Sequence, residues 1–235
     1  MKTIGMIGGM SWESSIEYYR ITNQRVREKL GGLHSAKSVM VSVDFAEIEV
    51  LQSSGRWDEA TQMMVDAALQ VQRGGADFLM ICTNTMHRMA EEVRAALQIP
   101  LLHIADATAA RVKQTGMTKI GLLGTRFTME EDFYCGRLES LHGLQVLVPN
   151  AAGRGLVHRV IYDELVLGQT KPASRAEFAR IISQMQAEGA QGVILGCTEI
   201  GLLVKQGDVD LPLFDTTRIH AEAAVDAALG ELDLS

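Results

Sequence analysis

The sequence predicts an α/β protein of two pseudo-equivalent domains, each a short parallel sheet flanked by helices, with an active site in the cleft between them. Two observations lead to this prediction. Short apolar runs alternate along the chain with longer amphipathic stretches, which is the pattern of parallel strands connected by helices. In addition, three segments of the first half recur in the same order in the second half.

The expected strands are short runs rich in Ile, Val, Leu and Met. They are Thr3–Ile7, Ser38–Val43, Phe78–Cys82, Leu101–Ile104, Ile120–Leu123, Val146–Val148, Gly192–Leu195 and Leu211–Phe214. The expected helices are amphipathic segments between these runs. They are Ser14–Leu30, Trp57–Arg73, Arg88–Leu97, Glu130–Leu141, Gly155–Leu167 and Ser174–Glu188.

The internal repeat fixes the expected domain division. "TIGMIGGMS" from Thr3 matches "KIGLLGTRF" from Lys119, "GADFLMICTNT" from Gly75 matches "GAQGVILGCTE" from Gly189, and "IPLLHIADAT" from Ile99 matches "LPLFDTTRIH" from Leu211. Because all three matches keep their order and nearly the same offset, duplication is a better explanation than chance. We therefore expect a first half over residues 1–115, rejoined by segment 216–235, and a second half over residues 116–215.

Composition narrows the classes of function. A chain of 235 residues with 47% hydrophobic content can build a large core without disulfides. Its three cysteines are too few for a disulfide framework, which favours a reducing compartment and a cytoplasmic location. The net charge of −7, without a basic stripe, argues against nucleic acid as a partner. No segment has the length and hydrophobicity of a signal-peptide core or a membrane span, so no membrane partner is expected.

The most informative stretch is "ICTNTMH", which follows an apolar run and contains Cys82, Thr83 and His87. The repeat aligns Thr83 with Cys197, Asn84 with Thr198, Thr85 with Glu199, and Cys82 with Gly196. Since ligands bind at the carboxyl ends of strands in doubly wound sheets, Thr83 and Cys197 are expected on opposite walls of one site. The glycine opposite Cys82 indicates that this position needs no side chain.

Each candidate residue also has a structural interpretation. Cys197 precedes a helix start, whose N–H groups are expected to lower its pKa and favour the thiolate, although a free cysteine is most often a small buried hydrophobe. Cys82 and Cys135 are interpreted as packing residues. His87 is expected to make a local hydrogen bond at a helix start, because its spacing from Cys82 is not that of a zinc site. No metal is expected.

Glycines mark two strand-to-helix turns, "GMIGGMS" and "GLLGT". Neither turn contains a G-x-G-x-x-G pattern or a P-loop lysine. Such turns still present backbone N–H groups, which can bind a small carboxylate without a basic side chain.

Taken together, the motifs resemble the cofactor-independent aspartate/glutamate racemase superfamily, nearest its aspartate racemase branch. The resemblance covers the whole chain and rests on Gly8-Gly9-Met10-Ser11, Thr83-Asn84-Thr85, Gly124-Thr125 and Gly196-Cys197-Thr198-Glu199. It implies a two-base mechanism, in which one group removes the Cα proton of an amino acid and a second group protonates the opposite face. It also implies that no pyridoxal phosphate or other cofactor is used, and that the protein is a homodimer.

The resemblance assigns roles to nine residues. Thr83 and Cys197 are the expected catalytic residues. The expected substrate-binding residues are Met10, Gln52, Asn84, Thr85, Thr125, Thr198 and Glu199.

The sequence differs from the family pattern in two places, and both differences change what is expected of the catalytic and substrate-binding residues. Thr83 stands where the first family cysteine is expected, and Cys82, one residue earlier, leaves the strand on the opposite face. A threonine hydroxyl can donate or relay a proton but is a poor base, so the two walls are unequal. Gln52 and Val166 stand where aspartate-selective relatives use basic residues, which extends the expected substrates to other polar amino acids, homoserine among them.

Three functions follow from this pattern. The first is an amino-acid racemase with Cys197 as the main acid/base for the L-enantiomer and Thr83 as a weak proton donor. The second is a single-cysteine decarboxylase of a malonate-type acid, which would release CO2. The third is a non-catalytic amino-acid sensor, which would show no Cα–H exchange.

Overall fold

The computed structural model describes residues 1–234, which form two compact units. Unit 1 contains residues 1–104 and 220–234, and unit 2 contains residues 105–219. The chain therefore passes from one unit to the other twice. Each unit is described by itself below.

Unit 1 contains a four-stranded parallel sheet with strand order β2-β1-β3-β4. Its strands are β1 Ile4–Gly8, β2 Ser38–Ser42, β3 Phe78–Ile81 and β4 Leu101–Leu102. Its helices are α1 Trp12–Leu30, α2 Phe45–Ser53, α3 Trp57–Arg73, the 3₁₀ turn η1 Thr85–Met89, α4 Ala90–Ala95 and most of α11 Thr216–Ala228.

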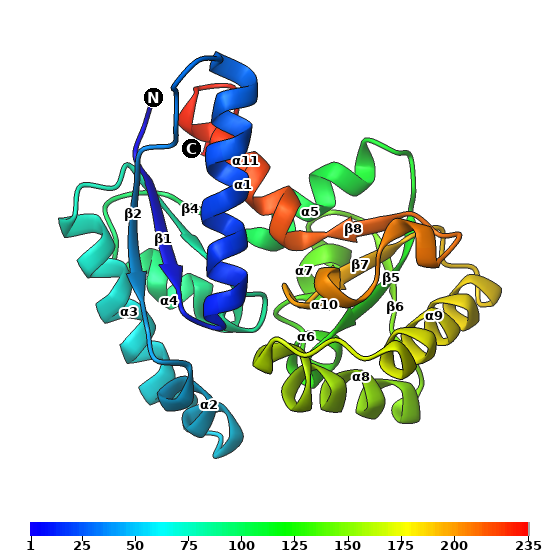
Figure 1. Cartoon of the computed structure of the whole chain (residues 1–235). Coiled ribbons are helices and arrows are strands. Elements are labelled where there is room, and N and C mark those ends of the chain that lie inside the picture. The colour runs from blue at the N-terminus through cyan, green and yellow to red at the C-terminus, as the bar shows by residue number, and fades with distance from the viewer. Residues whose placement is uncertain (235) are drawn as a thin grey trace. The chain divides into compact units, whose positions relative to one another are not determined.

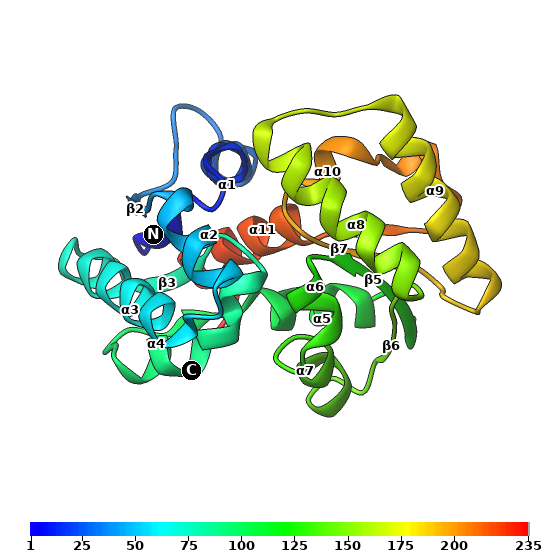
Figure 2. The same cartoon turned by 90° about the horizontal axis from the view of Figure 1, so that it is seen from below.

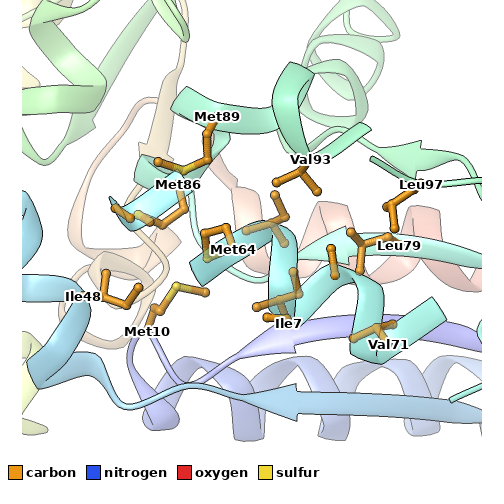
Figure 3. Close-up of a cluster of buried hydrophobic side chains, with 14 of the residues drawn as sticks. Ile7, Met10, Ile48, Met64, Val71, Leu79, Met86, Met89, Val93 and Leu97 are labelled. Carbon is orange, nitrogen blue, oxygen red and sulfur yellow. The ribbon is translucent and has the colours of Figure 1, made fainter. Parts of the chain in front are cut away.

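The two faces of this sheet bury different apolar clusters, because successive side chains of a strand point to opposite faces. Ile7, Leu79 and Ile81 pack with side chains of α2, α3 and α4. Figure 3 shows Ile7 and Leu79 in this cluster. Met6 and Met80 pack with side chains of α1 and α11 on the other face. Figure 1 accordingly shows α1 and α11 along one side of the first sheet and α3 along the other.

Helix ends in unit 1 follow from local chemistry. Ser11 caps α1, since its hydroxyl accepts a hydrogen bond from the Ser14 N–H, and α1 ends at Gly31 with a positive φ of 75°. Helix α3 has acidic residues in its first turn and Arg73 in its last, which matches the helix dipole.

Unit 2 contains a second four-stranded parallel sheet with strand order β6-β5-β7-β8. Its strands are β5 Lys119–Gly124, β6 Gln145–Leu147, β7 Val193–Gly196 and β8 Leu213–Asp215. Its helical segments are α5 Ile104–Lys113, α6 Arg126–Glu130, α7 Cys135–Ser140, α8 Ala151–Asp163, η2 Leu165–Leu167, α9 Pro172–Ala187, α10 Ile200–Leu203 and η3 Gln206–Asp208. Helices α8 and α9 contact each other, and Figure 2 shows both along the same side of the second sheet.

The two sheets confirm the predicted fold class of two similar parallel sheets flanked by helices. Strand order is the same when β1, β2, β3 and β4 are compared with β5, β6, β7 and β8. The register is also the same, since Ile7 pairs with Ile81 in unit 1 and Leu123 pairs with Leu195 in unit 2. This register agrees with the alignment that places Thr83 opposite Cys197.

Several element boundaries differ from the predicted ones. Of the expected helix Glu130–Leu141, the structure forms only the shorter α7, because α6 lies before it and shares only Glu130 with the predicted range. The expected helix Arg88–Leu97 is the shorter α4 after a 3₁₀ turn. The expected strand Leu101–Ile104 has only two paired residues, because Ile104 already begins α5. Helices α2, α5, α10 and α11 were not among the six expected helices.

The compact units begin and end at other residues than the predicted halves. The predicted first half ended at residue 115, whereas the helix that starts at Ile104 packs almost entirely in unit 2. There Asp106 accepts hydrogen bonds from Arg137 and His142, at 2.8 and 2.7 Å from its Oδ1. Within residues 1–234, no helix has the length and apolar character needed to cross a membrane.

Candidate functional site

In unit 1 the candidate residues follow the carboxyl end of β3. The Cys82 side chain is buried in the apolar cluster beneath α1 and α11, and burial raises its pKa. Thr83 is the next residue and is partly exposed. The structure therefore gives Cys82 the packing surroundings that the repeat alignment indicated.

Asn84 and Thr85 are buried at the start of η1. The His87 side chain lies one turn further along and contacts the carbonyl oxygen of Thr83 through Nδ1 at 2.7 Å. This confirms the predicted local hydrogen bond of His87. Its effect is to hold the backbone of Thr83 against the 3₁₀ turn.

Gln52 and Met10 lie among apolar side chains of the same unit. Gln52, from α2, is buried, and its Nε2 lies 2.9 Å from the sulfur of Met86. Met10 belongs to the apolar cluster that also contains Met86 and Ile48 (Figure 3). Because the Met10 side chain is in this core, a substrate contact at this position would come from its backbone.

The first glycine turn joins β1 to α1. Gly9 has a φ of 95°, and its N–H donates to the Ser15 hydroxyl oxygen at 2.7 Å. A Cβ at Gly9 would lie 2.1 Å from the carbonyl oxygen of Val43. The turn can thus adopt its conformation only with glycine. Ser15 was not among the predicted site residues, although it contacts this turn. The only sequence signal for it was the pair of serines at the start of α1.

In unit 2, Thr125 and Cys197 follow two neighbouring strands that end in paired glycines, Gly124 and Gly196. Thr125 caps α6, where its Oγ1 lies 3.3 Å from the Thr128 N–H nitrogen. The structure therefore brings Thr125 to the same edge of the sheet as Cys197.

Cys197, Thr198 and Glu199 form a hydrogen-bonded cluster at the end of β7. The Cys197 thiol donates to Glu199 Oε2 at 3.0 Å, and the Thr198 hydroxyl donates to the same oxygen at 2.8 Å. All three residues are buried, with only 2% of Glu199 exposed. The thiol thus has a carboxylate within reach that can accept its proton.

The sequence-based expectation of a lowered Cys197 pKa is wrong. Burial raises this pKa well above the ordinary value, and the charge and hydrogen bond of Glu199 raise it further. Backbone N–H groups of Thr198 and Glu199 act in the opposite direction, but more weakly. The cause is that burial removes the thiolate from water and the Glu199 carboxylate lies beside it, whereas α10 is a single turn whose dipole is small.

Cys135 lies apart from this cluster. Its thiol donates to backbone carbonyls of Thr128 and Met129, and burial, together with nearby carboxylates, raises its pKa to about 11. In residues 1–234, no three His, Cys, Asp or Glu side chains are arranged to hold a metal ion.

Comparison with known proteins decides the family. The family model described as Asp/Glu/Hydantoin racemase matches residues 7–224, which is most of the chain. The chain belongs to the Asp/Glu/hydantoin racemase family. The match includes both glycine turns and both strand ends described above.

Two solved structures share this fold, and one curated protein is similar in sequence. The crystal structure of an Asp/Glu racemase candidate from Yersinia pestis is 55% identical, covers 97% of this chain and 100% of its own, and has a TM-score of 0.90. An aspartate racemase homologue from Pyrococcus horikoshii is 35% identical with the same coverage and a TM-score of 0.84. The broad specificity amino-acid racemase RacX of Bacillus subtilis is 24% identical over 73% of this chain and 74% of its own length.

Proposed function

We propose that this protein is a cofactor-independent amino-acid racemase in which Cys197 and Thr83 act on opposite faces of the substrate Cα. Family membership supports the reaction class. The observation that carries the assignment of residues is the shared register of the two sheets, which gives Thr83 and Cys197 equivalent positions after β3 and β7.

Cys197 is the proposed base for the L-enantiomer. Glu199 accepts the thiol proton through the existing 3.0 Å hydrogen bond, and the thiolate then removes the Cα proton. The Cα–H bond breaks, an S–H bond forms, and the electron pair delocalises onto the substrate carboxylate. Hydrogen bonds that strengthen as this charge develops lower the barrier.

Thr83 is the proposed donor on the opposite face. Its hydroxyl, or a water that it holds, gives a proton to the carbanion, so that an O–H bond breaks and a new Cα–H bond forms. Cys197 is a thiol again after it has taken the Cα proton, and proton exchange with solvent returns Glu199 and Thr83 to their starting protonation states. Because an alcohol is a far weaker acid and base than a thiol, this step is slow compared with proton transfer at Cys197.

The remaining candidates are proposed to bind substrate. Asn84, Thr85, Thr125 and Thr198 supply neutral donors, as do the backbone N–H groups near Met10, for the α-carboxylate and its developing charge. Gln52 and Val166 replace basic residues at the distal end of the substrate. The proposed substrates are therefore aspartate, glutamate and other polar amino acids such as homoserine, bound by hydrogen bonds in place of a distal ion pair.

Two further properties are proposed from the sequence and the resemblance. A homodimer is expected, which sedimentation at several protein concentrations would test. A cytoplasmic location is expected from the use of cysteine as free thiols.

Proton NMR of L- and D-amino acids in D2O tests the function, because it reports Cα–H loss and stereochemistry together. The wild type should exchange the L-enantiomer much faster than D-product appears, while Cys197→Ala should lose at least about 10²-fold in exchange. Cys82→Ala and Cys135→Ala are matched controls that should retain most activity. Thr83→Cys should accelerate racemisation and open exchange from the D-enantiomer.

Each opposing outcome has a defined meaning. Enantiomers have equal free energy, so kcat/KM for racemisation must be the same in both directions, whereas the exchange rates of the two enantiomers can differ. Equal exchange of L- and D-forms by the wild type would contradict the weak role of Thr83. Release of CO2 from a malonate-type acid would establish the decarboxylase instead, and binding without exchange would establish the sensor.

A further inference from the structure

The buried side chain of His87 forms hydrogen bonds with the Thr83 carbonyl and with the backbone N–H of Ile104, where the chain leaves unit 1 for the first time. The His87 Nδ1 lies 2.7 Å from the Thr83 oxygen, and the Ile104 N–H donates to His87 Nε2 at 3.2 Å. A carbonyl oxygen only accepts, so Nδ1 carries the proton, while Nε2 uses its lone pair. His87 is thereby fixed as the neutral Nδ1–H tautomer.

Two more imidazoles and a phenol continue this polar cluster. The rings of His103 and His220 have centroids 4.4 and 5.9 Å from that of His87. His220 Nε2 donates to the Leu102 carbonyl at 2.9 Å, so its Nδ1 accepts from the Tyr18 hydroxyl at 3.1 Å. His103, His220 and Tyr18 are titratable groups of this network near His87.

The cluster lies where the chain enters and leaves unit 1. Ile104 is the last residue of the first passage through this unit, and His220 is the first residue of the second passage. The backbone of Thr83 is thus tied through His87 to the segment that precedes the first crossing. A shift of that segment would move the Thr83 carbonyl with it.

The second unit has no equivalent of this bridge. In the shared register, Gly201 takes the place of His87 and Asp215 takes that of His103. A Cβ at Gly201 would lie 2.8 Å from Asp215 Oδ2, so the place of an imidazole there is already filled. The bridge belongs only to the half that carries threonine in place of cysteine.

We propose that His87 is a positioning residue for proton transfer at Thr83, acting through its hydrogen bond to the Thr83 carbonyl. A weak hydroxyl acid depends strongly on its alignment with the reacting carbon. The His87 bridge fixes the backbone from which this hydroxyl projects. The inference rests on the proposed racemase function.

Two substitutions of His87 test its two hydrogen bonds separately. In His87→Asn the amide nitrogen replaces Nδ1 and can still donate to the Thr83 carbonyl, whereas in His87→Gln the amide oxygen replaces Nε2 and can only serve the Ile104 N–H. We expect His87→Gln to slow the appearance of D-product from an L-amino acid in D2O by on the order of tenfold. Exchange of the L-enantiomer at Cys197 should stay within about twofold, and His87→Asn should restore most of the D-product rate.

Controls distinguish positioning from damage to the fold. His142→Gln makes the same change at a histidine whose side chain contacts Asp106, which is not a candidate residue, and should alter neither rate. The two His87 substitutions can also be measured in the Thr83→Cys background, where proton transfer at position 83 should be faster and easier to follow. Equal losses of L-exchange and D-product in both His87 variants would overturn the proposal in favour of a purely structural role.

A spectroscopic measurement tests the bridge without substrate. Long-range ¹H–¹⁵N NMR of the wild type should show His87 as the neutral Nδ1–H tautomer, and an Nε2–H tautomer would overturn the proposal. If the wild type exchanges no amino acid at all, the proposed function fails together with the positioning role. If it does exchange and the two variants behave alike, only the positioning role fails.

Discussion

At the scale of single residues, the contact of Cys197 with Glu199 bears on the proposed role of Cys197 as a base. Burial, the Glu199 charge and its hydrogen bond raise the thiol pKa, in that order. Glu199→Gln removes the charge, so we expect a lower Cys197 pKa and a thiol that reacts with iodoacetamide at lower pH. The same variant loses the proton acceptor, so Cα exchange of L-amino acids should fall by on the order of 10²-fold.

The alkylation measurement needs a background in which Cys197 is the only cysteine, provided by Cys82→Ala with Cys135→Ala. Glu177→Gln is a matched control, because Glu177 is a half-exposed carboxylate paired with Arg180 in the same unit. It should leave the alkylation profile unchanged. A midpoint that stays constant or rises in Glu199→Gln would show that Glu199 does not raise the Cys197 pKa.

Part of the candidate site could be predicted because the internal repeat aligns its residues in the two halves. The equivalence of Thr83 with Cys197 needs only aligned strands, and the register of β3 and β7 agrees with it. The Cys197 pKa was predicted in the wrong direction, since it depends on burial and on the direction of the Glu199 side chain. The contact of Gln52 with Met86 was also beyond prediction, because it joins two elements far apart in the sequence.

At the scale of elements, the turn between β1 and α1 depends on Gly9. Alanine there would have to adopt a φ of 95° and place its Cβ 2.1 Å from the Val43 carbonyl oxygen. We expect Gly9→Ala to lower the free energy of unfolding by about 2–4 kcal/mol, measured by urea denaturation. Gly143→Ala is the control, because Gly143 also has a positive φ but open space at its Cβ, and should cost about 1 kcal/mol.

Helices with a clear apolar period were predictable, and short ones were not. The bounds of α3, Trp57–Arg73, agree with the prediction, since its apolar positions recur over four turns. Helix α5 was missed because its first residue, Ile104, extends the apolar run that predicts a strand. The expected helix over Glu130–Leu141 begins too early, since the segment around Asp132 and Phe133 is a turn between α6 and α7.

At the scale of the whole molecule, the chain is two copies of one topology with a terminal segment that returns to the first copy. The Lys2 N–H donates to the Ala228 carbonyl at 2.8 Å, and Lys29 forms ion pairs with Asp226 and Glu231. These contacts attach residues 220–234 to the N-terminal strand and helix of unit 1. The sequence-based expectation began this returning segment at residue 216, whereas unit 1 resumes at His220 in the structure.

His220 makes the stability of the protein dependent on pH. Burial lowers its pKa from 6.5 to about 4, although the Leu102 carbonyl partly opposes this shift. The unfolded chain therefore binds a proton more readily than the folded chain between these two pH values. The contribution of neutral His220 to the free energy of unfolding is fully present above about pH 6.5. It is lost as the pH falls towards 4, by a total of about 3 kcal/mol.

The measurement is the unfolding free energy from urea titrations between pH 7 and pH 4.5, for the wild type and His220→Gln. The variant has no imidazole to protonate, so its stability should be lower at pH 7, where the bonds to Tyr18 and Leu102 are disturbed, but should fall less steeply with decreasing pH. His34→Gln is the control, because that imidazole is exposed in the folded chain, and its profile should follow the wild type. Parallel profiles for wild type and His220→Gln would show that protonation of His220 does not govern the acid sensitivity of the fold.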